Sequence, residues 1–140
     1  MQTERDNVSA KYRQALTSMA VLKLARSPLH NELHNELNDL AIVVNTNGYI
    51  IGVNEVWVKI MGYTPGESIG IHYAELMQPE FIKLTEAAFK DLKTTDSESE
   101  KYINKYKTHS GGCITLEWYG WHKVGALILS KAKVLNYEIY

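Results

Sequence analysis

Between residues 39 and 136 the hydrophobic positions follow the period of a strand near both ends and the period of a helix in the middle. Two β-branched runs, residues 41–44 and 49–53, flank Asn47-Gly48, a dipeptide that strongly favours a tight hairpin. Three longer strands follow residue 100, with a turn at Gly111-Gly112. This order predicts an α+β fold, a five-stranded antiparallel sheet with short helices on one face.

The middle of this region carries several helix signals. Asn54 is a cap residue, and the apolar positions Val56, Trp57, Ile60 and Met61 recur at helical spacing until Gly62. Residues 64–67 have the pattern of a capping box with proline at the first helical position. Another helix begins at Pro79 and ends near Lys93; its predicted buried stripe is Phe81, Leu84, Ala87, Ala88 and Leu92, with Lys83, Glu86 and Lys90 in solvent.

The late strands show a period of two. After a polar surface loop at residues 94–100, Tyr102, Asn104 and Tyr106 share one side of a strand, as Ile114, Leu116 and Trp118 do on the next. A slip of one residue would instead turn Ile103 and Lys105 toward the helices. Residues 124–135 are nearly continuously apolar until Lys131, which is typical of a central strand.

Several of these segments together resemble the PAS (Per-Arnt-Sim) sensor domain. Residues 47–54 match its strand, glycine turn and strand ending in asparagine, and residues 61–70 match its Gly-Tyr-(Ser/Thr)-x-x-Glu-x-x-Gly segment. Residues 75–80 and the stretch from Ser110 to Trp118 resemble its next segment and its late hairpin. Residues 131–136 depart from the Asp-Ile-Thr-like motif that ends many PAS domains, so the effector lies either beyond Tyr140 or on a separate partner.

The resemblance implies a pocket between sheet and helices that is both aromatic and polar. We expect a small ligand there to contact Trp57, Met61, Phe81, Tyr102, Asn104, Tyr106, Leu116 and Trp118. The alternative is a filled core, because large aromatic side chains can occupy the whole volume.

The cofactor is not identified by the sequence. The photoactive flavin relatives carry a cysteine where residues 71–77 here have none, and the haem relatives take an axial histidine from a long helix that has none here between Pro79 and Lys93. His72 lies just upstream and is a weaker candidate for a haem ligand.

Residues 1–38 precede the sensor-like region (residues 39–137) and are predicted to be helical, with a break at Ser27-Pro28. One interpretation is a homodimer seam, as in similar PAS modules, formed by Leu16, Met19, Leu29, Leu33 and Leu37. The other is a pair of helices that pack against their own domain. A three-leucine edge is too short for an independent coiled coil, so the sheet would have to contribute.

Composition and motifs narrow the possible functions. The 140 residues suit one domain, with 45% hydrophobic and 22% charged residues. A net charge of -1 disfavours nucleic-acid binding, and no apolar run is long enough to span a membrane. A cytoplasmic protein is therefore expected, and the lone Cys113 fits a reducing compartment.

Catalytic and metal-binding motifs give little support for an enzyme. His30 and His34 are four residues apart, but Asn31 occupies the position where zinc proteases have their glutamate, so a solvated helix face is favoured over a metal site. Cys113 has no basic residue placed to activate it as a thiol nucleophile.

The sequence thus predicts a non-enzymatic signalling domain that binds a ligand or a partner protein and relays the change to an effector, such as a histidine kinase, through a dimer interface. The alternative is a ligand-free dimerisation or scaffold module.

Overall fold

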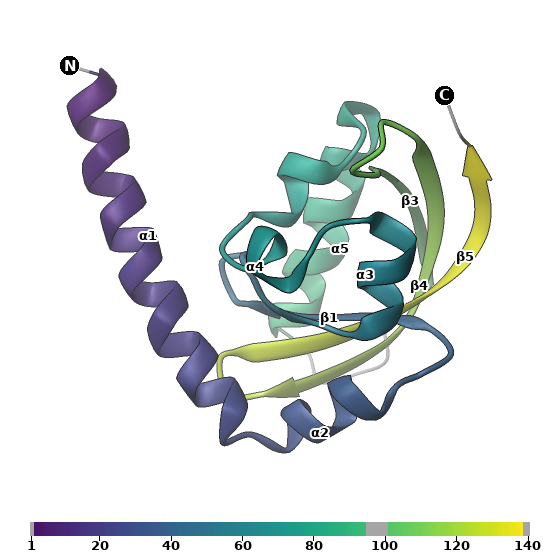
Figure 1. Cartoon of the computed structure of the whole chain (residues 1–140), viewed down its shortest axis with the longest axis horizontal. Coiled ribbons are helices and arrows are strands. Elements are labelled where there is room, and N and C mark those ends of the chain that lie inside the picture. Colours follow the sequence, from purple (N-terminus) through teal and green to yellow (C-terminus); the bar gives the residue numbers. More distant parts are fainter. Residues whose placement is uncertain (1, 95–100, 139–140) are drawn as a thin grey trace.

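The computed structural model describes residues 2–94 and 101–138, with side chains for residues 14–90 and 101–138. The described residues form an antiparallel sheet of five strands in the order β2-β1-β5-β4-β3 (Figure 1). In chain order the elements are α1 (Gln2–Ala25), α2 (Pro28–Asn35), β1 (Leu40–Asn45), β2 (Ile50–Val53), α3 (Glu55–Met61), α4 (Pro65–Ser68), the 3₁₀ helices η1 (Tyr73–Leu76) and η2 (Pro79–Phe81), α5 (Ile82–Thr94), β3 (Tyr102–Lys107), β4 (Cys113–Val124) and β5 (Leu127–Glu138). The α+β fold is confirmed, and the final strand is central.

Local capping signals set the first half of the fold as predicted. The β1–β2 hairpin turns at Gly48, whose φ of 87° suits glycine. Asn54 accepts a hydrogen bond from the Trp57 backbone N–H and starts α3, which ends at Gly62 in the left-handed conformation. Thr64 and Glu67 form both hydrogen bonds of the capping box at α4. These contacts fix where the short helices leave the sheet.

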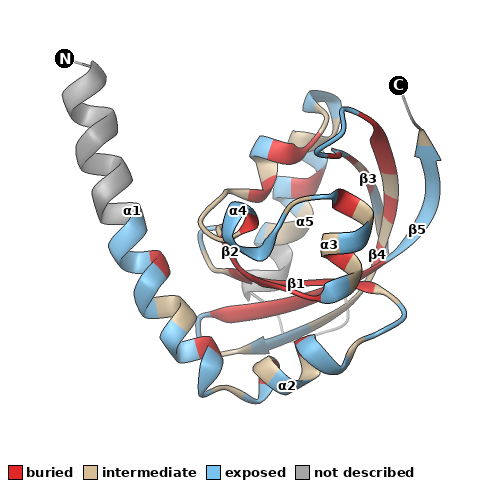
Figure 2. Ribbon diagram, in the orientation of Figure 1, coloured by how far each residue is buried: buried red, intermediate tan, exposed pale blue. Residues whose placement is uncertain are grey.

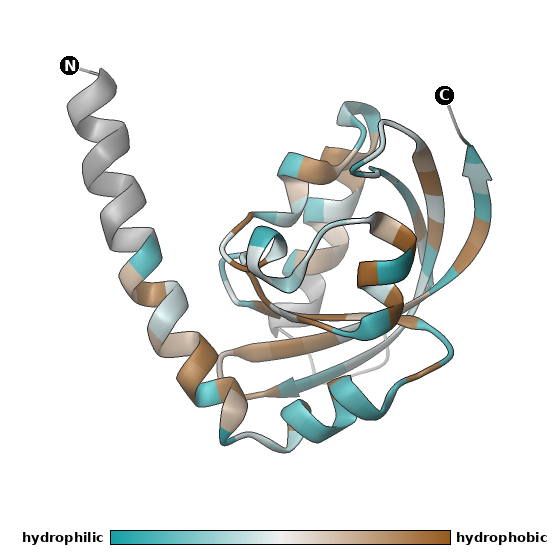
Figure 3. Cartoon of the chain, viewed as in Figure 1, coloured by the Kyte–Doolittle hydropathy of each residue, from teal (hydrophilic) through white to brown (hydrophobic). Residues whose placement is uncertain are grey.

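The sheet buries apolar side chains on both faces: the short helices cover one face, as predicted, and the N-terminal extension covers part of the other. The larger core lies between the sheet and α3, α4, α5 and the 3₁₀ helices, and includes Trp57, Tyr106 and Trp118. A second core lies on the opposite face, where α2 and the end of α1 cover β1 and β2. Figures 2 and 3 show β1 and the first half of β5 as largely buried and hydrophobic between these two layers.

The buried face of one helix and the boundary of one strand differ from the sequence prediction. The buried face of α5 is rotated, because Leu84 is exposed whereas Thr85 is buried and Phe89 packs against the core. Val124 is the last residue of β4, since a turn at Gly125 (φ 59°) separates it from β5. Most of the predicted surface loop at residues 94–100 lies outside the described residues.

The second core corrects part of the predicted dimer seam. Ser27 caps α2 and Pro28 is its first residue, as expected. Leu29 and Leu33 are fully buried against β1, β2 and β5 of their own chain, so they are not available to a partner subunit. Leu37 follows the end of α2 and is exposed. The interpretation in which these helices pack on their own domain therefore holds for α2.

Candidate functional site

A small cavity lies between the sheet and α5, and we call it the inner cavity. Its lining residues come from six elements and are Ile42 and Val44 of β1, Tyr73 of η1, Thr85 and Phe89 of α5, Tyr102 and Tyr106 of β3, Trp118 of β4, and Ser130 of β5. Its volume is about 20 Å³, which is room for about one water molecule. In this conformation the described part of the core is therefore nearly filled.

The sequence-predicted pocket residues divide into two groups. Tyr102, Tyr106 and Trp118 line the inner cavity, and their strands have the predicted phase. The other five do not line the cavity. Trp57, Met61 and Leu116 are fully buried in the larger core, and Phe81 is partly buried and packs against that core. Asn104 is buried and hydrogen-bonded to Trp118. Sequence reasoning missed Thr85 and Phe89 because it assigned the wrong face of α5, and it did not consider Ile42, Val44, Tyr73 or Ser130.

Asn104 organises the polar side of the cavity. Its side-chain oxygen accepts a hydrogen bond from Trp118 Nε1 at 2.8 Å, and its amide nitrogen donates to Thr85 Oγ1 at 3.3 Å. All three residues are buried. Because an unpaired buried polar group is costly, this set of bonds fixes the orientation of the Trp118 indole and holds α5 against β3.

The tyrosines around the cavity remain neutral. Burial raises the pKa of Tyr102 and of Tyr106 above the ordinary tyrosine value. The Tyr106 ring makes edge contacts with Trp57 and Trp118, at centroid distances of 6.4 and 6.2 Å, and Tyr102 stacks on Trp121 at 5.6 Å. The walls of the cavity are thus largely aromatic, with neutral tyrosine side chains among them.

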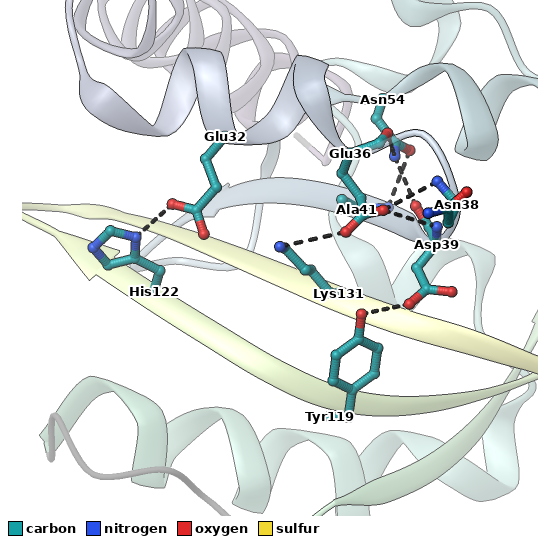
Figure 4. A network of polar contacts seen from close by, with 9 residues as sticks. All are labelled: Glu32, Glu36, Asn38, Asp39, Ala41, Asn54, Tyr119, His122 and Lys131. Atoms are coloured by element: carbon teal, nitrogen blue, oxygen red, sulfur yellow. Dashed lines mark hydrogen bonds and ion pairs between the residues drawn. The ribbon is translucent and has the colours of Figure 1, made fainter.

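A polar network on the opposite face joins the N-terminal segment to the sheet (Figure 4). Asn54 accepts a hydrogen bond from the Ala41 backbone N–H at 3.0 Å, and its amide nitrogen donates to the carbonyls of Glu36 and Asp39 at 2.9 and 2.8 Å. The Glu36 carboxylate accepts hydrogen bonds from the backbone N–H groups of Asp39 and Asn38, and these bonds, with Lys131 nearby, lower its pKa. One asparagine therefore ties the start of α3 to the connection between α2 and β1.

Three side-chain contacts extend this network across β4 and β5 (Figure 4). Lys131 Nζ lies 3.4 Å from the Glu36 carboxylate. The Tyr119 hydroxyl donates to Asp39 at 2.5 Å, and His122 Nδ1 lies 2.6 Å from the Glu32 carboxylate. Residues of α2 and of the following connection are thus attached to β5, which lies beside β1, and to β4, the next strand in the sheet.

The described residues offer little support for metal or thiol chemistry. No group of three or more histidine, cysteine, aspartate or glutamate side chains among them could hold a metal ion. His72 Nδ1 accepts a hydrogen bond from the Ala74 backbone N–H and so caps η1. Cys113 is buried, with its sulfur 3.7 Å from the Gln78 amide nitrogen. In the described part of the chain, no helix combines the length and the hydropathy needed to cross a membrane.

Comparisons with solved structures support the architecture. The PAS domain of the quorum-sensing receptor RpfR from Cronobacter turicensis, in complex with C12:0, aligns with a TM-score of 0.62 and 15% identity, over 73% of this chain and 98% of that one. The Drosophila melanogaster Cycle PAS-B domain with bound ethylene glycol aligns with a TM-score of 0.61 and 16% identity, over 69% and 99% of the two chains. The Rhodobacter sphaeroides LOV protein aligns with a TM-score of 0.63 and 14% identity, over 76% and 64%.

At these identities the structural matches show the fold alone. No curated protein matches the sequence. The profile of the PAS domain family matches residues 38–118, which is more than half of the chain and includes the β1–β2 hairpin, the capped helices and the Asn104–Trp118 pair. The chain therefore belongs to the PAS domain family.

Proposed function

We propose that this PAS domain is a non-catalytic sensor that binds a small ligand or a partner protein and relays the change to an effector through its N-terminal helices. A signal at the inner cavity would alter the packing of β1 and β5, and through them the docking of α2. The two positions of α2, docked and shifted, would be the states between which the signal selects.

One observation carries this proposal, namely that two of the strands lining the cavity, β1 and β5, also contribute to the second core in which α2 packs. On β1, Ile42 and Val44 line the inner cavity, whereas Ala41 and Val43 belong to the second core. On β5, Ser130 lines the cavity, and its neighbours Leu127 and Leu129 contact the second core. Because alternate residues of a strand point to opposite faces, a shift of either strand acts on both sites together.

Hydrogen exchange at the α2 amides tests the relay with a matched pair of variants. Ile42→Val on β1 and Ile114→Val on β4 each remove one methylene from a buried inner-face isoleucine, at a cost of about 0.5–1.5 kcal/mol. We expect Ile42→Val to increase exchange in α2 more than Ile114→Val does. Equal exchange in α2 for the two variants, at equal loss of global stability, would contradict the relay.

We further propose that the relay ends in a homodimer seam on α1. The exposed apolar residues Leu16, Met19 and Leu22 lie on one side of this helix, whereas Thr17 and Leu24 are buried against the body of the domain. Figure 1 shows the N-terminal half of α1 extending away from that body. An exposed apolar stripe on a projecting helix suits contact with a second copy of the chain.

Sedimentation velocity tests this seam. Met19→Glu places a charge in the stripe, and Gln14→Glu adds the same charge at an exposed position outside it. We expect the wild type and Gln14→Glu to sediment as dimers and Met19→Glu as a monomer. If all three have the same mass, α1 is not the seam.

The second candidate function, a ligand-free scaffold, is favoured by the small size of the inner cavity. Native mass spectrometry of fresh protein distinguishes it by the lack of any bound small molecule.

A further inference from the structure

A second space opens at the surface of the domain, next to the inner cavity. It is a surface cleft of about 340 Å³, lined by the hairpin turn at Asn47 and by His72, Tyr73, Glu86, Phe89 and Lys90, and we call it the outer cleft. Tyr73 and Phe89 line both spaces. Their ring centroids are 5.4 Å apart. These two rings therefore form the wall between the outer cleft and the inner cavity.

One side of the outer cleft is held in place by contacts between the hairpin turn and the start of η1. The Tyr73 backbone N–H donates to the Gly48 carbonyl at 3.0 Å, and the Tyr73 ring stacks on His72 at 4.5 Å. Glycine is required at position 48 for two reasons: its φ is positive, and a Cβ there would lie 2.6 Å from His72 Nε2. A ligand would thus meet a preformed surface on this side.

The other side of the cleft is one face of α5. Glu86, Phe89 and Lys90 stand three and four residues apart, so a carboxylate, an aromatic ring and an ammonium group share that face. Tyr73 lines the cleft across from α5, and burial, followed by the negative charge of Glu86, raises the pKa of its hydroxyl to about 12. At neutral pH this hydroxyl is therefore a hydrogen-bond donor within the electrostatic influence of Glu86.

We propose that the outer cleft binds a small zwitterion with an apolar body, the chemistry of a free hydrophobic amino acid. Its ammonium group pairs with Glu86, its carboxylate pairs with Lys90, and its side chain lies on the rings of Tyr73 and Phe89. This site deepens the proposed function and rests on it, since a ligand that contacts the shared wall acts on the inner cavity without entering it.

Three probes separate the contributions of the two charges. L-Phenylalanine carries both, 3-phenylpropionate only the carboxylate, and 2-phenylethylamine only the ammonium group. Amide chemical shifts recorded during titration should move for L-phenylalanine around Asn47, His72 and residues 86–90. Each single-charge analogue should bind about tenfold or more weakly, because a charge-assisted hydrogen bond is lost. Absence of shifts at the cleft with L-phenylalanine, or equal binding of an analogue, would overturn the proposal.

Charge-neutral variants with matched controls assign the groups. Glu86→Gln should weaken L-phenylalanine about tenfold but leave 3-phenylpropionate unchanged, and Lys90→Gln should have the same selective effect with 2-phenylethylamine unchanged. Glu80→Gln and Lys83→Gln are the controls, since both residues are exposed and neither lines the cleft. Equal effects of the cleft variants and their controls would show that net charge, and not this site, governs binding.

The site and the relay fail in different ways. If L-phenylalanine shifts the cleft amides but leaves hydrogen exchange in α2 unchanged, the binding site stands and the relay is wrong. If Ile42→Val changes α2 as expected while no probe shifts the cleft, the relay stands and the outer cleft is not its input.

Discussion

Gly52→Ala is the sharpest perturbation of the contact between α2 and the sheet. Gly52 lies on β2 beneath the second core, and a Cβ there would come within 2.7 Å of Leu24 Cδ2 and 3.0 Å of Leu33 Cδ2. Its φ is not in the left-handed region, so alanine is compatible with the backbone. The substitution therefore acts through packing alone, at the point where the N-terminal helices meet the strands.

The expected cost follows from this overlap. Non-bonded carbon atoms pack best at about 3.5–4.0 Å, so the two leucines must withdraw by about 0.5–1.3 Å. Both are buried, which leaves little room, and overpacking of this kind costs about 1–3 kcal/mol. The gain from a stiffer unfolded chain, about 0.4–1 kcal/mol, offsets part of that cost. A net loss of about 1–2 kcal/mol remains, or about 3–6 °C in Tm for a domain of this size.

Thermal unfolding and hydrogen exchange measure this effect against Gly66→Ala. Gly66 is in α4, has no positive φ, and a Cβ there would meet its nearest neighbour at 4.0 Å. We expect the control to be neutral or slightly stabilising, and Gly52→Ala to lower Tm and to increase exchange in α2 ahead of the rest of the domain. Identical behaviour of the two variants would refute the packing argument.

Two further predictions concern the polar network. Asn54→Ala removes four hydrogen bonds of a buried side chain, so it should destabilise the domain by about 2–4 kcal/mol in urea unfolding, whereas Asn38→Ala at an exposed position should have little effect. The lowered pKa of Glu36 means that its contribution to stability is present above the ordinary value of 4.5 and is lost as pH falls through the folded-state value. Glu36→Gln should therefore flatten the loss of stability in that acidic range, and an unchanged pH profile would contradict the assignment.

Local signals made much of the fold predictable. The Asn47-Gly48 turn, the Asn54 cap and the Thr64 capping box each depend on residues within a few positions of one another, and all form as expected. The phase of β3 and β4 was also predictable, because alternation of apolar and polar residues specifies which face is buried.

Long-range contacts account for what the sequence did not reveal. Thr85 is buried on α5 because its hydroxyl accepts a hydrogen bond from Asn104, and no hydrophobic pattern signals such a pair. Likewise, Leu33 packs over Gly52, which lies on a strand distant in the sequence. The spacing of Leu29, Leu33 and Leu37 alone fits a dimer seam as well as it fits packing on the sheet. The inner cavity combines residues from six elements, of which sequence reasoning brought together those on β3 and β4.

A double-mutant cycle between the two faces of the sheet tests the central claim most directly. Ile42→Val perturbs the cavity side of β1, and Gly52→Ala perturbs the docking of α2 on the other side. If the faces are coupled, the two changes in unfolding free energy should deviate from additivity by at least about 0.5 kcal/mol, while Ile114→Val with Gly52→Ala should add within about 0.3 kcal/mol. Additivity in both cycles would contradict a relay from the inner cavity to the N-terminal helices.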